Sequence, residues 1–517
     1  MKKSVITLLL LTMVVFAGCG QKDLFAQWEE DWAAFEQASS KAVSEEESEE
    51  VIPEELMDAG SVTKYNAEEQ GLIRPYELQQ AEHDSPHVDW AYAAFKVIEA
   101  GLIKQGDANK DTIDLSEGNY IYYAVNTEED FLANQEEDIF YLSSAYGMNV
   151  TDPFYKGING YSNLFIGMDG KGIVSETDAP FDESNKEEIT SSIGGLAIGE
   201  SEGRIKRENS DWIITGYSRI EPTDIAQAKE LLLEKGALQI DYEFSLLGYH
   251  DGAYHTKYFG GNAIRSGVII GWDDSYARTN FKESMQPEND GAWLVYDCMG
   301  AKLGSDGYIW VSYENPAIAS LYSYDVVPRS RYGKVFSYTA IGYNQGIKAE
   351  GEEYTTVANI YENPEDELIT AVGIFAYSPG QQVEVEIYTN VFDANPTSGT
   401  LASSMSITAD NCGYAVYDLE NTVSLNGGEA FSVVLKYGND GTDEWGVEFG
   451  VAPVEGPAFD FEMDVQYNFY FTSAKGQSYG MRNGEWYDLS EESSAEQFGE
   501  SEVLNNVFMK VLTKRKG

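Results

Sequence analysis

The stretch IRSGVIIGWDD, residues Ile264–Asp274, and the later stretch GAWLVYDCMGAKLGSDGYIWVSYEN, residues Gly291–Asn315, decide the fold. Both contain short apolar runs bounded by Gly, Asp and Asn, a pattern that predicts β-strands over Gly267–Gly271, Ala292–Tyr296 and Tyr308–Tyr313. Glycine, tryptophan and tyrosine recur at fixed spacings at Gly271, Trp272, Trp293, Gly300, Gly304, Gly307 and Tyr308. We therefore expect these strands to build one half of a domain as a sheet.

This spacing resembles the C-terminal half of the papain-like cysteine peptidase family. In that family a catalytic His enters a strand that ends in Gly-Trp, and an Asn follows a Trp-containing strand. The resemblance extends upstream to Asp114–Glu117 (DLSE) and Gly157–Phe181, which are similar to the family's Leu-Ser-Glu element and its Gly-Gly-Asn stretch. Anchored on these, Val88–Ala93 (VDWAYA) takes the place of Ser-Cys-Trp-Ala-Phe-Ala. The resemblance implies an α+β papain-like domain, with a helical half and a β half, over residues 61–328.

The resemblance also implies four site positions, and other residues occupy all four. The nucleophilic Cys position holds Asp89, the His position Arg265, the Asn position Asp297 and the oxyanion-hole Gln position His83. Papain chemistry needs a thiolate that is activated by an imidazole. A guanidinium stays protonated and cannot act as a base. We therefore expect no catalysis through this triad. One hypothesis is that Asp89, Arg265 and Asp297 form an ionic lock, and the alternative is independent drift of three unconstrained positions.

Two other arrangements of reactive groups are conceivable. Cys298 directly follows Asp297, and His255 lies on the segment that leads toward Arg265, but no spacing supports a pair between Cys298 and His255. An acid pair of Asp89 and Asp297 with a shared proton is the other arrangement. A guanidinium between the two carboxylates would keep both ionised, which argues against the shared proton.

A weak calcium motif lies at Asp107, Asn109 and Asp111, which alternate as oxygen ligands do in a calcium loop. An EF-hand needs Gly at the sixth position and Glu at the twelfth, where this chain has Thr112 and Gly118. A polar turn between a helix and the next segment is the better interpretation. We expect no cofactor.

The start of the chain predicts export and a lipid anchor. Residues 1–18 have two lysines followed by an apolar run too short to span a membrane, which is typical of a signal peptide. The run ends in Phe16-Ala17-Gly18-Cys19, which resembles a bacterial lipoprotein cleavage box, so Cys19 is the predicted lipidation site. Residues 19–60 contain the acidic run Ser44–Glu50 and are predicted to form a tether.

Length and charge limit the remaining possibilities. A chain of 517 residues is too long for one core and indicates two domains. Its 87 acidic and 34 basic side chains give a formal charge of −53, which argues against nucleic acid as a partner.

Residues 329–517 show alternating strands between Gly, Asn and Asp turns, which predicts an all-β sandwich. They resemble the lectin-like β-domain that follows papain-like domains in some bacterial surface proteins. The matching pieces are Tyr388–Asn390, Pro396–Gly399, Phe431–Lys436, Gly476–Tyr479, Trp486–Leu489 and Asn506–Val511. Trp445 and Trp486 are candidates for stacking on sugar rings, although anchoring the core is the commoner role of such residues.

The leading expectation is an exported, membrane-anchored lipoprotein whose papain-like domain binds a polypeptide or surface polymer without cleaving it, with a lectin-like domain for adhesion. The alternatives are an active papain-type cysteine peptidase and a structural cell-envelope protein with a glycan-binding sandwich. Partners are accordingly a polypeptide or a cell-surface glycan, with the membrane reached through the anchor.

Overall fold

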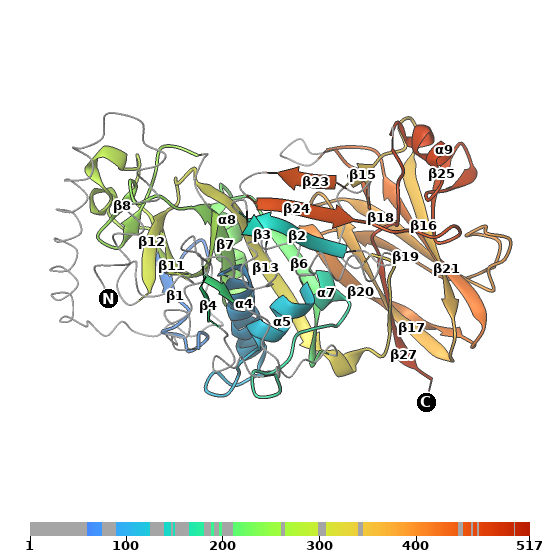
Figure 1. Cartoon of the computed structure of the whole chain (residues 1–517), viewed down its shortest axis with the longest axis horizontal. Coiled ribbons are helices and arrows are strands. Elements are labelled where there is room, and N and C mark those ends of the chain that lie inside the picture. The colour runs from blue at the N-terminus through green and yellow to red at the C-terminus, as the bar shows by residue number, and fades with distance from the viewer. Residues whose placement is uncertain are drawn as a thin grey trace.

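The computed structural model of the protein describes residues 59–74, 89–124, 139–145, 148–149, 165–179, 188–190, 196–198, 210–259, 264–297, 307–339, 345–442, 448–455, 459–462, 465–500 and 502–516. The predicted signal peptide, Cys19 and nearly all of the tether lie outside these residues, as do His83, Cys298 and Trp445. The described chain is mostly β-structure with few helices (Figure 1).

The α-helices are α4 (Asp89–Gln105), α5 (Glu117–Ala124), α7 (Phe165–Met168), α8 (Ile225–Lys235) and α9 (Glu492–Ala495). Helix α4 buries nearly all of its first fourteen residues, and both α4 and α8 pack on strands β7 (Leu238–Glu243), β10 (Ile264–Asp273) and β13 (Ile318–Pro328). The sequence favours Thr223 as the cap of α8, but the cap is Asp224, whose side chain accepts a hydrogen bond from the Gln227 amide at 3.0 Å. The carboxylate of Asp224 satisfies one of the amide donors that a helix start leaves open.

The largest sheet has thirteen strands and continues through both predicted domains. Its order is β14-β27-β17-β20-β6-β13-β7-β10-β11-β12-β9-β8, with β1 paired on β10. The strands not yet bounded are β1 (Lys64–Asn66), β6 (Trp212–Ile220), β8 (Tyr249–His250), β9 (Ala253–Tyr254), β11 (Ala292–Asp297), β12 (Tyr308–Ser312), β14 (Val335–Phe336), β17 (Glu367–Ala376), β20 (Cys412–Leu425) and β27 (Lys510–Arg515). The junction between the two predicted domains is the antiparallel pair β6–β20, in which Gly413 lies opposite Ser218.

The Gly-Trp motif has a steric explanation in this sheet. Gly271 lies opposite Asn66 in the antiparallel β1–β10 pair, and a Cβ added there would lie 2.1 Å from the Tyr65 carbonyl oxygen. The neighbouring Trp272 is fully buried and donates its indole N–H to the Val62 carbonyl at 3.2 Å. The motif therefore fixes the segment that contains Val62 and β1 onto the sheet.

The second sheet has six strands in the order β19-β18-β21-β16-β25-β26. They are β16 (Tyr354–Asn363), β18 (Gln382–Thr389), β19 (Thr400–Thr408), β21 (Glu429–Gly438), β25 (Ser478–Arg482) and β26 (Glu485–Asp488). One hydrophobic core joins side chains of this sheet, such as Val385 and Val433, to side chains of the larger sheet, such as Ile374 and Val511. Two sheets that share an apolar core are the arrangement found in β-sandwiches.

Contacts at the junction reach beyond the β6–β20 pair. Phe508, close to the C-terminal end, belongs to the same core as the helices and packs edge-on against Phe165 of α7 at 5.4 Å between ring centroids. The Lys510 ammonium is fully buried, lies 2.7 Å from an Asp169 carboxylate oxygen and donates to the Thr339 carbonyl at 2.5 Å. Phe508, just before β27, and Lys510, its first residue, therefore contribute an apolar and a charged contact to the junction.

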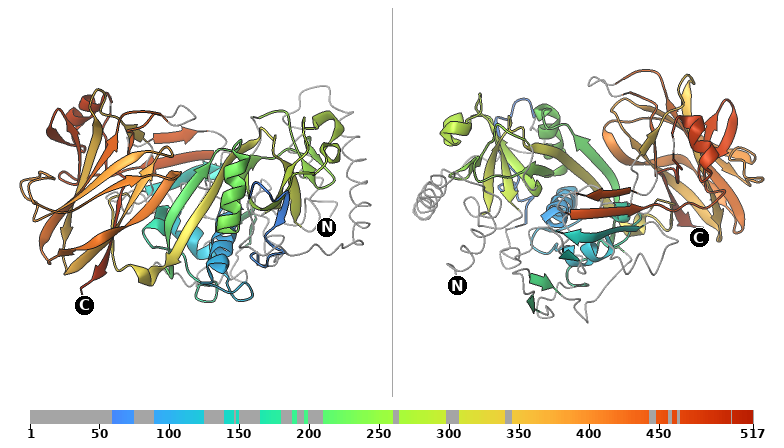
Figure 2. Two further views of the ribbon diagram at one scale, coloured as in Figure 1. Left: turned by 180° about the vertical axis from the view of Figure 1, so that it is seen from behind. Right: turned by 45° about the horizontal axis from the view of Figure 1, so that its top comes forward.

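Three smaller sheets accompany these two in the described residues, and Figure 2 shows strands of one of them, in cyan and red, side by side. They comprise β2 (Ile139–Ala145), β3 (Met148–Asn149), β23 (Phe459–Glu462) and β24 (Val465–Tyr470) in one, β4 (Glu188–Thr190) and β5 (Leu196–Ile198) in another, and β15 (Gln345–Ile347) and β22 (Ala452–Val454) in the third. Among the helices that the structure describes, none combines the length and apolar character that crossing a bilayer requires.

Candidate functional site

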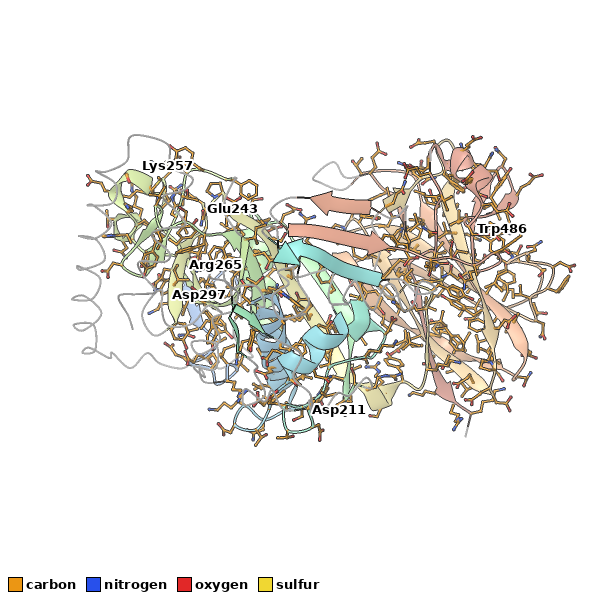
Figure 3. The ribbon with its side chains drawn as sticks, viewed as in Figure 1. Asp211, Glu243, Lys257, Arg265, Asp297 and Trp486 are labelled. Atoms are coloured by element: carbon orange, nitrogen blue, oxygen red, sulfur yellow. The ribbon has the colours of Figure 1, made fainter. Side chains whose placement is uncertain are left out.

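The structure brings Asp89, Arg265 and Asp297 together from three elements: the start of α4, the start of β10 and the end of β11. Strand pairing sets the geometry, because Gly267 lies opposite Asp297 in the β10–β11 ladder, two residues beyond Arg265. Figure 3 shows Arg265 and Asp297 next to each other near α4. These are the three positions that the resemblance equates with the catalytic triad.

Arg265 and Asp297 form an ion pair. A guanidinium nitrogen of Arg265 lies 3.7 Å from a carboxylate oxygen of Asp297, which is completely buried. The guanidinium carbon also lies 4.2 Å from the ring centroid of Phe244, a cation–π distance. Arg265 is therefore held between a buried carboxylate and an aromatic face.

Asp89 interacts with the backbone beside Arg265. Its carboxylate accepts a hydrogen bond from the Ser266 amide at 2.7 Å, and its side chain is buried. Burial, with smaller contributions from the nearby Asp241 and Asp297 carboxylates, raises the pKa of Asp89 to about 7, although the Ser266 N–H and the Arg265 charge oppose the change. Near neutral pH this carboxyl group therefore exists in both protonation states. Of the contacts expected for an ionic lock of three side chains, the structure contains the ion pair between Arg265 and Asp297, while Asp89 binds the adjoining backbone.

A third buried carboxylate, Asp241, belongs to the same cluster and was missed in the sequence. The Ser266 hydroxyl donates to Asp241 at 2.6 Å, and Gln239 donates to the same oxygen at 3.1 Å. The side-chain oxygen of Gln239 in turn accepts a hydrogen bond from the Tyr324 hydroxyl at 2.7 Å. In the sequence Asp241 lies on the polar side of the alternating stretch Leu238–Phe244, so only the structure shows that it is buried.

The chemistry open to this cluster is limited. One guanidinium faces one buried carboxylate, two further buried carboxyl groups bind the neighbouring Ser266, and neither a thiol nor an imidazole from the described part of the chain takes part in these contacts. A guanidinium cannot take a proton from a nucleophile and return it. The arrangement is suited to charge compensation and to fixing α4 against β10.

The other His and Cys candidates lie elsewhere or outside the described residues. His255 is buried, its Nδ1 is hydrogen-bonded to the Met285 carbonyl, and its ring packs edge-on against Phe281 at 6.2 Å. Burial lowers the pKa of His255, so its imidazole is neutral at pH 7. Cys298 and His83 lie outside the described residues, so their predicted roles stay predictions.

The calcium candidate forms a solvated turn. Asp107, Asn109 and Asp111 are all exposed, and the Asn109 side-chain oxygen accepts a hydrogen bond from the Asp111 amide at 2.9 Å. In the described part of the chain, no group of three or more His, Cys, Asp or Glu side chains is arranged to hold a metal ion. The turn geometry agrees with the polar-turn interpretation of this motif.

Trp486, the described sugar-stacking candidate, is partly buried on β26. Its indole N–H lies 3.4 Å from the Thr397 hydroxyl, which belongs to the loop between β18 and β19. The indole therefore braces that loop and shows only part of its surface to solvent.

Comparison with known proteins identifies the fold. The family described as lectin-like domain matches residues 335–499. The structure is similar to that of the cysteine protease and lectin-like domains of Cwp84, a surface-layer-associated protein of Clostridium difficile, with a TM-score of 0.66, 20% identity and coverage of 97% of this chain and 98% of that one. It is also similar to clostridial cysteine protease Cwp84 after propeptide cleavage, with a TM-score of 0.67, 21% identity and coverage of 88% and 100%. No curated protein matches. The chain therefore has the fold of a papain-like domain followed by a lectin-like domain.

Proposed function

We propose that the papain-like domain of this protein, with a helical half and a β half, is non-catalytic. It binds a polypeptide or surface polymer at the surface of the exporting cell. The lectin-like domain would support adhesion, and Cys19 would carry the lipid anchor. The surface location is supported by the signal-like start of the chain and by the similarity to Cwp84, which is a surface-layer-associated protein.

One observation carries the proposal: the three side chains at the triad positions are engaged in an ion pair and a backbone hydrogen bond within the protein. Arg265 is paired with the buried Asp297, and Asp89 accepts the Ser266 amide. In a papain-type mechanism the position held here by Asp89 supplies the attacking sulfur, and the position held by Arg265 accepts its proton. Members of such a triad act as a unit, so replacing even one costs several orders of magnitude in rate.

Hydrolysis of a mixed peptide library by the purified full chain tests the proposal. We expect no turnover above the buffer background, with or without a reducing agent. A Cys298→Ser variant serves as the matched control, because Cys298 is next to Asp297 in sequence. Thiol-dependent turnover that this variant loses would establish an active cysteine peptidase and overturn the proposal.

A gain-of-function variant tests the same point from the opposite side. Asp89→Cys, Arg265→His and Asp297→Asn together place the family's thiol, imidazole and amide at the three positions. Measurable thiol-dependent turnover by this variant alone would show that the scaffold still holds a peptide in a reactive pose.

A further inference from the structure

Exposed apolar side chains are concentrated next to the Arg265 site. The large hydrophobic residues that are exposed in the described part of the chain are Leu246, Leu247, Tyr258, Phe259, Ile264, Phe392 and Leu401. The first five lie on the segments that flank β8 and β9 and at the start of β10, and we name these five the apolar patch. Single exposed apolar residues are ordinary, whereas a contiguous group marks an interaction surface.

The two loops of the patch lie against each other. The His255 amide donates to the Gly248 carbonyl at 3.3 Å, and a Cβ added at Gly248 would lie 2.6 Å from the His255 carbonyl oxygen. The buried Tyr254 hydroxyl donates to the Glu243 carbonyl at 2.7 Å and accepts from the Ser245 amide at 3.2 Å. These hydrogen bonds therefore hold the loop with Leu246 and Leu247 beside the segment that leads to Tyr258 and Phe259.

Local hydrogen bonds hold both loops with their apolar side chains outward. The Leu247 amide donates to the Ser245 hydroxyl, and the Tyr258 amide donates to the Thr256 hydroxyl, both at 3.3 Å. Exposed fractions are 58% for Leu247, 69% for Tyr258 and 60% for Phe259. A surface that is already ordered loses less conformational entropy when a partner binds.

The patch is continuous with the candidate site. Ile264 directly precedes Arg265 and lies opposite Glu243 in the β7–β10 ladder. Phe244, whose ring carries the Arg265 guanidinium, is two residues before Leu246. In Figure 3, Lys257, Glu243, Arg265 and Asp297 lie along the same end of the molecule. A polypeptide bound at Arg265 would therefore also reach the apolar patch.

We propose that the apolar patch is the docking surface for an extended polypeptide that carries large apolar side chains next to Lys or Arg. The proposal rests on the proposed function and specifies the class of polypeptide. The apolar patch supplies the hydrophobic contact, and the formal charge of −53 favours basic flanking residues. The same charge repels a second copy of this chain and an anionic membrane surface.

Three labelled peptides test the proposal by fluorescence anisotropy with the full chain. In the first peptide Leu and Trp alternate with Lys, in the second Ala replaces Leu and Trp, and in the third Glu replaces Lys. We expect the first to bind about tenfold or more tightly than each of the others, because each of the two replacements removes one of the two attractions.

A pair of variants locates the binding surface. Leu247→Ser with Phe259→Ser removes two side chains of the apolar patch. Phe392→Ser with Leu401→Ser is the matched control, because these residues are exposed to similar extents, 58% and 50%, in the lectin-like domain. We expect the first double variant to weaken binding of the Leu/Trp–Lys peptide about tenfold or more, and the control to leave it unchanged.

The outcomes separate this inference from the proposed function. Equal binding of the peptide by the native chain and the patch variant would overturn the inference. It would not affect the proposal that the papain-like domain is non-catalytic. A preference of the native chain for neutral phosphatidylcholine vesicles over the peptide would overturn it in the same way. Cleavage of the bound peptide would instead overturn the proposed function.

Discussion

Replacing Asp89 with Asn should stabilise the protein, and more so as the pH rises. The Asp89 carboxylate is buried near the Asp241 and Asp297 carboxylates, and burial raises its pKa from 3.8 to about 7. An Asn side-chain oxygen can still accept the Ser266 amide, and it has nearly the same volume. The substitution therefore removes only the ability of this site to become charged.

The sign and size follow from proton linkage. The folded chain binds this proton more tightly than the unfolded chain, so the contribution of Asp89 is most favourable below about pH 4. It is lost progressively as the pH rises from about 4 to 7, and the separation between 3.8 and about 7 is equivalent to about 4 kcal/mol. The stability difference between Asp89→Asn and the native chain should therefore rise from near zero at pH 4 toward ~4 kcal/mol at pH 8.

Urea unfolding of both proteins across this pH range measures the difference directly. An Asp107→Asn variant controls for the general effect of removing one negative charge, because Asp107 is exposed. Its difference from the native chain should stay within about 0.5 kcal/mol at every pH. If Asp89→Asn is no more stable than the native chain at pH 8, Asp89 is not a destabilised buried acid and the description of the site is wrong.

Three further substitutions test other parts of the structure. Arg265→Met keeps the packing on Phe244 but removes the charge facing the buried Asp297, and should lower the free energy of unfolding in urea by about 3 kcal/mol. A loss that stays the same in the Asp297→Asn background would refute the ion pair. Lys510→Met removes the buried ammonium at the domain junction and should also cost about 3 kcal/mol in stability. Lys475→Met removes one partner of an exposed ion pair and should change stability by under about 1 kcal/mol. Equal effects of the two substitutions would contradict a buried junction. Gly413→Ala should weaken the junction, because the φ angle of Gly413 is +145° and the added Cβ would lie 1.9 Å from the Tyr217 carbonyl oxygen. Gly428→Ala is the control, because a Cβ added at Gly428 meets no atom within 4 Å. Limited proteolysis between the domains should increase only in the Gly413→Ala variant.

Much of the fold could be predicted from the sequence because the relevant patterns are local. The alternation over 383–389 and 430–437 predicted strands that the structure places at Gln382–Thr389 and Glu429–Gly438. The apolar, alanine-rich segment Val88–Ile103 is typical of a buried helix, and the structure has helix α4 at Asp89–Gln105. The resemblance to the papain-like family implied that Arg265 and Asp297 share one site.

Other features depend on pairing between distant segments, which no local pattern encodes. The β6–β20 pair joins residues about two hundred positions apart, and neither strand differs from an ordinary strand in composition. The protonation of Asp89 could not be predicted either, because it depends on Asp241, which reaches the site only through the β7–β10 ladder. The apolar patch was likewise invisible, since Leu, Tyr and Phe in a sequence give no sign of exposure.

The rate of cysteine alkylation in the native full chain at pH 6 tests most directly whether a reactive sulfur is present. At this pH an ordinary thiol is almost fully protonated, whereas a papain-type thiolate remains ionised and reacts quickly. We predict that no cysteine reacts with iodoacetamide faster than in the urea-unfolded chain, and that mass spectrometry finds no site labelled early. Rapid labelling of Cys298, abolished when His83 or His255 is changed to Ala, would reveal a working thiol–imidazole pair and contradict the non-catalytic account.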